Sequence, residues 1–422
     1  MSFFSFILYL ICVFIRPQEW VPAVLGWRLV DIFGITTIVL LLLESAGKPE
    51  GKRLVKAPQS GLMIGFFLAI LMSHVAHHYF GGLVNSFNIF LPTFILFFAI
   101  LNAINTEGKL KFTVWFIILV MFVLVFQGMY QMKYGIGWAG QPITPQGEDE
   151  VSLGRINWVG IFNDPNDLAL TFVIAVGFLL PFIFSRVNFI VRLINVAILG
   201  GLGYGIYLTN SRGGQLALLA TVFFFFVRKT KKFLIGGILG GLGAAVILTF
   251  GPSRMGTLSG AEESAANRMD LWWEGIQMLK SNPIFGVGYG MFADELPQTA
   301  HNSFVLAAAD LGLVGLFLWM ALIYVSMKGL FSVQNNNKEL ANYALGIQSA
   351  LVGFCAAAFF LSRTYVILPY MLFAMAGSIV WLNRQGEKSL ELKLQGRDLW
   401  NIFWLSIGIL VVIVLTIKIG TH

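Results

Sequence analysis

Three basic side chains could do chemistry: Arg212 and His301 each lie at the edge of an apolar segment, and Arg268 lies in the polar stretch between those segments. Arg212 belongs to a short polar link, Thr209-Asn210-Ser211-Arg212-Gly213-Gly214, between two apolar runs. A charge at such a boundary is costly without a partner, and a guanidinium pairs well with phosphate oxygens. One interpretation is an arginine that extends toward lipid head groups. The other is a clamp for an anion, with the neighbouring glycines allowing a ligand close to the backbone.

Arg268 projects from a predicted helix over 262–281, whose apolar side chains recur at three- and four-residue steps. This stripe predicts an amphipathic helix on the membrane surface, where a guanidinium is well placed to bind a lipid-linked phosphate. The alternative is a surface helix that closes a cavity and carries a solvated arginine. The residues of the stripe are Met269, Trp272, Ile276 and Leu279.

Local signals mark both ends of this helix. Ser259 and Glu262 have capping-box spacing before it, and Asn282-Pro283 ends it. Glycines at 286, 288 and 290 then predict a flexible turn toward the next apolar segment. No strand precedes these glycines, so they are not a phosphate-binding fingerprint.

His301 opens an apolar segment, and Asp310 follows within it. The ordinary pKa of histidine, near 6.5, suits a general base at neutral pH, although a histidine at a helix start is more often a cap or packing residue. Nine residues at about 100° each place Asp310 on the opposite face of a regular helix from His301. We therefore expect Asp310 to join a polar network inside the protein, with a partner that satisfies its carboxylate.

A second polar group precedes another apolar segment. Arg155 is followed by Phe162-Asn163-Asp164-Pro165-Asn166-Asp167, in which Asn or Asp next to Pro is typical of a turn. Asn163 or Asp164 is expected to cap the following helix. The alternative is that these side chains face the same cavity as His301. Further basic residues on this side are Arg363, His77 and His78.

The composition indicates that these groups are positioned by membrane-spanning helices. Hydrophobic residues make up 57% of 422, against about 45–50% in soluble domains, and charged residues only 12%. A span needs about 20 apolar residues. On that basis we expect an all-α, polytopic transmembrane bundle of about 12–13 spans, at 2–15, 28–44, 61–79, 86–104, 112–130, 166–184, 189–208, 214–227, 233–250, 302–326, 341–361, 366–382 and 399–418.

The basic residues predict the orientation of the bundle. Alternate segments, at 45–60, 105–112, 185–193, 228–232, 325–340 and 383–398, hold 18 of the 28 Lys and Arg residues and are expected in the cytoplasm. The net charge of +7 is thereby explained without nucleic acid. We expect one membrane domain over 1–422, with a smaller periplasmic loop at 131–165 and a larger one at 251–300.

Several chemistries have no motif in this chain. Cys12 and Cys355 lie in apolar runs, so neither a disulfide framework nor a metal cluster is implied. There is no HExxH, no Cys/His metal spacing, no DxD pair in the outer loops and no Walker A sequence. The expected site therefore contains no metal and no cofactor.

Three stretches in this order resemble the O-antigen ligase and polymerase superfamily. They are Ser211-Arg212-Gly213-Gly214; Arg268 with Trp272 and Pro283-Ile284-Phe285-Gly286-Val287-Gly288; and His301-Asn302-Ser303-Phe304, ending in Asp310-Leu311-Gly312-Leu313-Val314-Gly315. The resemblance covers about 160–320. The opening Ile15-Arg16-Pro17-Gln18-Glu19-Trp20 is similar to members associated with exopolysaccharide clusters.

The resemblance implies a metal-independent glycosyltransferase of the bacterial inner membrane with its active site facing the periplasm. The donor would be a glycan on undecaprenyl diphosphate. The acceptor would be lipid A–core in a ligase, or another lipid-linked glycan in a polymerase. Arg212 and Arg268 would hold the diphosphate, and His301 would take the acceptor proton. Substrate contacts are expected at Arg155, Asn163, Asp164, Asn302, Arg363 and Trp272.

Elementary chemistry agrees with these roles. Cleavage of a sugar–diphosphate bond leaves negative charge on the departing phosphate, and arginines can stabilise it where a metal does so elsewhere. We expect membrane lipid around the protein, and other polysaccharide-assembly proteins as partners. Arg212, Arg268 and His301 must then converge in one pocket.

Two other classes of function remain as alternatives. A transporter of lipid-linked oligosaccharides would place charges at the membrane midplane and show symmetric repeats. Only Asp310 lies well inside a predicted span, and no repeat is evident. A structural or sensing membrane protein would not need several cations and a histidine on one face.

Overall fold

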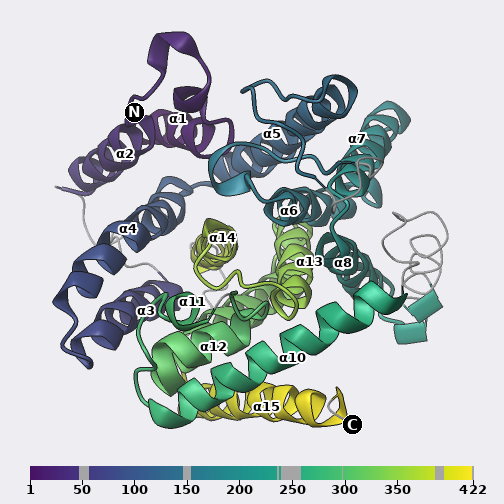
Figure 1. Cartoon of the computed structure of the whole chain (residues 1–422). Coiled ribbons are helices and arrows are strands. Elements are labelled where there is room, and N and C mark those ends of the chain that lie inside the picture. The colour runs from purple at the N-terminus through teal and green to yellow at the C-terminus, as the bar shows by residue number, and fades with distance from the viewer. Residues whose placement is uncertain are drawn as a thin grey trace. The chain divides into compact units, whose positions relative to one another are not determined.

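A computed structural model describes residues 1–46, 57–145, 154–234, 237–238, 258–296, 298–384 and 394–420. Throughout these ranges the regular elements are helices, accompanied by two isolated β-bridges (Figure 1). The α-helices are α1 (Ser2–Phe14), α2 (Leu29–Ser45), α3 (Pro58–Val75), α4 (Phe80–Ala103), α5 (Glu107–Tyr134), α6 (Pro165–Ile183), α7 (Phe189–Leu208), α8 (Arg212–Thr230), α10 (Leu258–Ser281), α11 (Phe292–Glu295), α12 (Ser303–Asn336), α13 (Ala341–Ala358), α14 (Ile367–Arg384) and α15 (Gly396–Gly420). Three short 3-10 helices are η1 (Pro17–Glu19), η2 (Pro22–Val24) and η3 (Gly160–Phe162).

The expected membrane helices are present. Among the described residues, nine helices are long and apolar enough to cross a membrane: α3, α4, α5, α6, α7, α12, α13, α14 and α15. Helices α1, α2 and α8 coincide with three further predicted spans. Most of the predicted span at 233–250 lies outside the described residues. The prediction of an all-α, polytopic helical bundle is confirmed.

The chain divides into two compact units that interleave along the sequence. Unit 1 comprises Met1–Lys52, Ala99–Pro252 and Leu330–Ala357, and α6 lies at its centre. Eighteen of the 19 residues of α6 are buried, and α5, α7 and α8 pack around it. The ring of Phe182 near its end meets Tyr343 of α13, with 4.9 Å between ring centroids. Unit 1 is thus organised around one almost entirely enclosed apolar helix.

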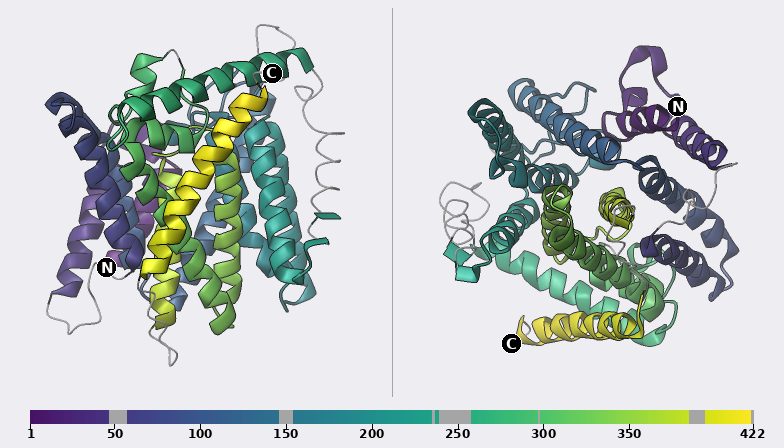
Figure 2. Two further views of the ribbon diagram at one scale, coloured as in Figure 1. Left: turned by 90° about the horizontal axis from the view of Figure 1, so that it is seen from below. Right: turned by 180° about the vertical axis from the view of Figure 1, so that it is seen from behind.

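Unit 2 comprises Arg53–Phe98, Ser253–Gly329 and Ala358–His422. Its buried centre is α14, which contacts α3, and the ring of Tyr370 on α14 packs against Phe66 and Phe90. Helix α10 runs across α12 and α15 at a large angle (Figure 2), and it contacts α15 directly. Unit 2 therefore places a transverse helix over its longitudinal ones.

The apolar stripe on α10 is a packing face within unit 2. Trp272, Ile276 and Leu279 are at most 9% exposed, whereas the neighbouring Trp273 is 42% exposed. The Trp272 ring meets Phe359 edge-on, with centroids 5.4 Å apart. This corrects the expectation that the stripe faces the membrane surface. An amphipathic pattern reports only that one face is apolar, and here protein covers that face.

Helix α12 is interrupted. Gly312 has φ 66° and ψ −165°, which is not a helical conformation, and the helix resumes beyond it. The Leu313 and Val314 amides donate to the carbonyl oxygens of Pro283 and Ile284, at 2.8 and 3.3 Å. The loop after α10 thus supplies the acceptors that the broken helix lacks. We call this arrangement of the 283–292 loop, Asp310 and Gly312 the α12 break.

Candidate functional site

Arg212 is the first residue of α8 and is half-buried in unit 1. Ser211 precedes it as the N-cap, with its Oγ accepting from the Gly214 amide at 3.0 Å. Cationic and unsatisfied amide groups at a helix N-terminus favour an anion. The link between α7 and α8 therefore places a cation at a helix N-terminus, and anion binding there stays a prediction.

Arg155 reaches the same link from the preceding loop. Its Nε donates to the Thr209 carbonyl oxygen and its Nη2 to Asn166 Oδ1, both at 3.0 Å. Ser211 Oγ donates to that same Asn166 oxygen at 2.7 Å. We call Arg155, Asn166 and the residues 209–212 the Arg212 turn. It brings together two of the predicted basic residues, Arg155 and Arg212.

Asn163 and Asp164 have structural roles beside this turn. Asp164 caps α6, with Oδ1 accepting from the Asn166 amide at 2.8 Å, as expected for the capping interpretation. Asn163 Oδ1 accepts from Asn157 Nδ2 at 3.2 Å. Asn157 in turn bonds to Gln131 of α5 through its Oδ1, at 2.6 Å. These contacts fix the loop before α6, and any direct substrate contact by either residue stays a prediction.

His301 lies immediately before the N-cap of α12 in unit 2. It is half-buried and has φ 49°, a left-handed backbone conformation. Asn302 is fully buried and caps the helix, with Oδ1 accepting from the Phe304 and Val305 amides at 2.9 and 3.1 Å. Because Asn302 performs the capping, the imidazole of His301 is not needed as a cap.

Arg363 is held next to this helix start. Its amide donates to Ser303 Oγ at 2.7 Å, and that hydroxyl donates to the Leu361 carbonyl oxygen at 2.6 Å. Thr364 Oγ1 donates to the Ser303 carbonyl oxygen at 2.7 Å. The link between α13 and α14 is thus fastened to the residues that follow His301.

Arg268 is half-buried on α10, one helical turn before Trp272 on the same face. Trp272 contacts Phe359, whose ring lies 6.4 Å from that of Phe304 on the first turn of α12. This face of α10 therefore approaches the start of α12. Unit 2 thus brings Trp272 and the link that carries Arg363 close to the start of α12, where His301 and Asn302 lie, and Arg268 is one turn further along α10.

The α12 break lies further along the same helix. Asp310 is fully buried and accepts from the Gly290 amide at 3.0 Å, the Phe292 amide at 3.1 Å and the Tyr365 hydroxyl at 3.0 Å. Its expected partners and its place in a polar network are confirmed. The break also explains the glycine at position 286. A Cβ on Gly286 would lie 2.3 Å from the Asp310 carbonyl carbon, so only glycine fits there.

The glycine-rich loop is consequently not the flexible turn that the sequence predicts. The Val287 and Gly288 amides donate to the carbonyl oxygens of Ala309 and Asp310, at 2.9 and 3.0 Å. His77 Nε2 donates to the Gly286 carbonyl oxygen at 2.7 Å. The Tyr289 amide donates to Ser73 Oγ at 3.0 Å. These bonds seat the loop between α12 and the end of α3.

Sequence reasoning missed Tyr289 and Tyr365. Their ring centroids are 4.5 Å apart. Burial, followed by the negative charge of Asp310, raises the pKa of each phenol above its ordinary value. In the sequence, the one sign that Tyr365 could join the site is that it follows Arg363 by two residues in a short link.

The predicted residues divide between the units. Arg155, Asn163, Asp164 and Arg212 belong to unit 1, and the other predicted site residues to unit 2. Convergence of Arg212 with Arg268 and His301 stays a prediction. In the part of the chain that the structure describes, no three His, Cys, Asp or Glu side chains are grouped as metal ligands. Metal-independent chemistry likewise stays a prediction.

The nine long apolar helices of the described ranges define a multi-pass membrane protein. The family model of the O-antigen ligase domain matches residues 195–320, the segment that contains Arg212, Arg268 and His301. The resemblance to the O-antigen ligase and polymerase superfamily is confirmed over that segment.

Two curated proteins are similar to part of the chain. One is a candidate polysaccharide ligase of Rickettsia felis, 25% identical over 109 residues. Another is a candidate polysaccharide ligase of Rickettsia conorii, 25% identical over 111 residues. The matches cover 22% of this chain, and 27% and 26% of these two relatives.

Proposed function

We propose that this protein is an O-antigen ligase-like glycosyltransferase that moves a glycan from undecaprenyl diphosphate to an acceptor hydroxyl. The observation that carries the proposal is the family match over 195–320, which contains three basic residues, each at a helix start or on a transverse helix. The acceptor is the sugar of lipid A–core or a similar lipid-linked glycan.

The proposed reaction needs a general base and cations that stabilise the leaving diphosphate, and this chain has candidates for both. The acceptor hydroxyl attacks the anomeric carbon of the donor sugar, and the bond from that carbon to the diphosphate oxygen breaks. His301 takes the acceptor proton as general base. Arg212 and Arg268 stabilise the charge that develops on the departing diphosphate. The polyprenyl chain of the donor stays in the membrane, which accounts for chemistry at the ends of apolar helices.

The proposed location is the inner membrane of a bacterium, with the active site on the periplasmic side. The asymmetry of Lys and Arg between alternate segments supports this orientation. Surrounding membrane lipid and other polysaccharide-assembly proteins are the proposed partners.

Transfer by purified protein tests the proposal. The protein is given undecaprenyl-diphosphate glycan and lipid A–core in the presence of EDTA, and the product is separated by gel electrophoresis. We expect transfer without added metal, and a loss of about 100-fold or more in Arg212→Ala and in His301→Ala. Exposed Arg28→Ala is the matched control.

The outcomes separate the alternatives. Transfer that survives both substitutions would remove Arg212 and His301 from the site. Product formed only when a second lipid-linked repeat unit replaces lipid A–core would identify a repeat-unit polymerase instead of a ligase. Movement of the intact donor across a vesicle membrane, without glycan transfer, would identify a transporter of lipid-linked oligosaccharides.

A further inference from the structure

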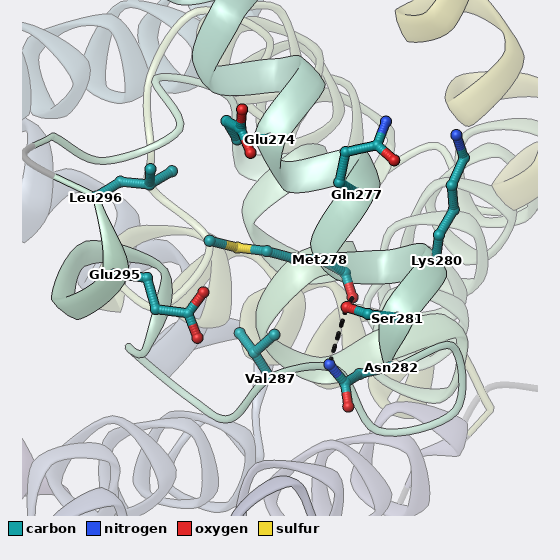
Figure 3. A pocket seen from close by; sticks show the side chains of 9 residues that line it. All are labelled: Glu274, Gln277, Met278, Lys280, Ser281, Asn282, Val287, Glu295 and Leu296. Carbon is teal, nitrogen blue, oxygen red and sulfur yellow. Dashed lines mark hydrogen bonds between the residues drawn. The ribbon is translucent and has the colours of Figure 1, made fainter.

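The second half of α10, the loop that follows it and α11 line a pocket of about 580 Å³ within unit 2 (Figure 3). Pockets of about 300–1,000 Å³ are usual for small-molecule ligands. None of its lining residues is among the basic or histidine side chains to which the proposed function assigns the transfer chemistry. The pocket therefore requires a separate explanation.

The lining combines hydrogen-bonding and apolar side chains. Glu274 of α10 and Glu295 of α11 lie on either side of Met278 in the view of Figure 3. Val287 and Leu296 supply further apolar carbon. Carboxylates accept hydrogen bonds from hydroxyl groups, and apolar side chains cover carbon-bound hydrogens. A polyhydroxylated ring has both kinds of surface, so this lining matches a sugar.

Gln277 adds a hydrogen-bond donor to this lining. The side chain lines the pocket, and its buried Nε2 has no acceptor among the described residues. A buried donor left unsatisfied costs about 1–3 kcal/mol, which a ligand oxygen would recover. A sugar hydroxyl or ring oxygen is an acceptor of the required kind.

The charges argue against a phosphate in this pocket. The lining contains two carboxylates and one cation, Lys280, whose Nζ lies 5.0 Å from the centroid of the Trp273 ring. Like charges repel a diphosphate but tolerate neutral sugars and favour amino sugars. The pocket is thus chemically distinct from the basic residues assigned to the diphosphate.

The position on α10 relates the pocket to those residues. Glu274 follows Arg268 by six residues, which is about 9 Å along a helix axis. The opposite wall is fastened to α12, because the amide of Val287 donates to Ala309. A glycan with its phosphate at Arg268 would need only a few sugar rings to reach the pocket.

We propose that this pocket is an oligosaccharide subsite for neutral or amino-sugar rings of a glycan handled by the enzyme. The inference rests on the proposed function, which supplies the glycan. The donor and the acceptor both carry such rings, so the tests below include one arm for each.

Direct binding is the first test. The full-length protein in lipid nanodiscs is titrated with repeat-unit oligosaccharide, released by mild acid from the lipid-linked glycan of the host bacterium. Saturation-transfer NMR follows binding. We expect affinity to fall about tenfold or more in the double variant Glu274→Ala/Glu295→Ala and severalfold in Gln277→Ala. Glu339→Ala, at an exposed carboxylate in unit 1, is the control and should bind as the wild type does.

Transfer kinetics are the second test. In the double variant, a higher KM for the lipid-linked donor with unchanged kcat assigns the pocket to the donor, and a higher KM for lipid A–core assigns it to the acceptor. Unchanged oligosaccharide affinity in the double variant, or an equal loss of affinity in Glu339→Ala, would overturn the subsite. In either case, glycan transfer by the wild-type protein would leave the proposed function standing. Wild-type protein that binds the oligosaccharide but transfers nothing would overturn the proposed function and retain the pocket.

Discussion

The Arg212 turn of unit 1 and the α12 break of unit 2 hold their polar groups in different ways. In the Arg212 turn, one amide oxygen, Asn166 Oδ1, accepts from both Arg155 and Ser211. In the α12 break, amides of the inserted loop donate to carbonyl oxygens of Ala309 and Asp310. Side chains fix the first region, whereas the second combines bonds between backbone segments with the buried Asp310 carboxylate.

This difference determines which substitutions each region tolerates. A side chain that loses its partner can rotate toward solvent or another group, particularly when it is half-buried like Arg155 and Asn166. Two backbone segments in close contact have no such freedom, because one side-chain carbon added to a glycine between them forces them apart. We therefore expect the α12 break to be sensitive to small changes and the Arg212 turn to be more adaptable.

The largest effect is expected from Gly312→Ala. Its φ of 66° is unfavourable for alanine, and the new Cβ would lie 2.4 Å from the Ile284 carbonyl oxygen. Backbone strain and overpacking each cost about 1–3 kcal/mol, so the free energy of unfolding should fall by about 2–6 kcal/mol. Gly203→Ala in α7 of unit 1 is the control, since nothing lies within 4 Å of its added Cβ. Thermal unfolding in detergent measures both variants. Equal melting temperatures for Gly312→Ala and Gly203→Ala would contradict the expected sensitivity of the α12 break.

A smaller effect is expected when one acceptor is removed from each region. Asp310→Ala leaves the Gly290 amide, the Phe292 amide and the Tyr365 hydroxyl without their acceptor in a buried position. That should destabilise the protein by about 3 kcal/mol. Asn166→Ala removes the acceptor of two half-buried or capping groups and should cost about 1 kcal/mol. Unfolding in increasing denaturant measures both, and losses of equal size would show that the two regions are equally adaptable.

The smallest effect is expected from Tyr365→Phe, which deletes one hydrogen bond to Asp310 and should cost about 1 kcal/mol at neutral pH. The raised pKa of the Tyr365 phenol means that its contribution is present below pH about 10, where an unfolded tyrosine ionises, and is lost as the pH rises toward the folded value. Melting temperatures from pH 7 to 11 should therefore fall less steeply in the variant than in the wild type. Parallel melting curves for the variant and the wild type would exclude the Tyr365 phenol as the source of the stability lost at high pH.

Much of the fold could be predicted from the sequence because membrane helices are marked by local composition. Each predicted span in the described ranges coincides with a helix, since about 20 apolar residues leave few other conformations in lipid. The capping role of Asp164 and the end of α10 near Asn282 were likewise local signals. The resemblance over 160–320 predicted the segment that matches the O-antigen ligase model.

The sequence by itself determined the helices, their apolar faces and the basic residues at their ends, because those properties depend on neighbours within a few positions. The tertiary structure decided what covers the stripe on α10, why the glycines at 286 and 312 are required, and which groups satisfy Asp310. These depend on segments such as 283–292 and Tyr365, which meet α12 from distant positions in the chain. Periodicity cannot predict such meetings, because it records which face of a helix is apolar or polar and not what packs against it.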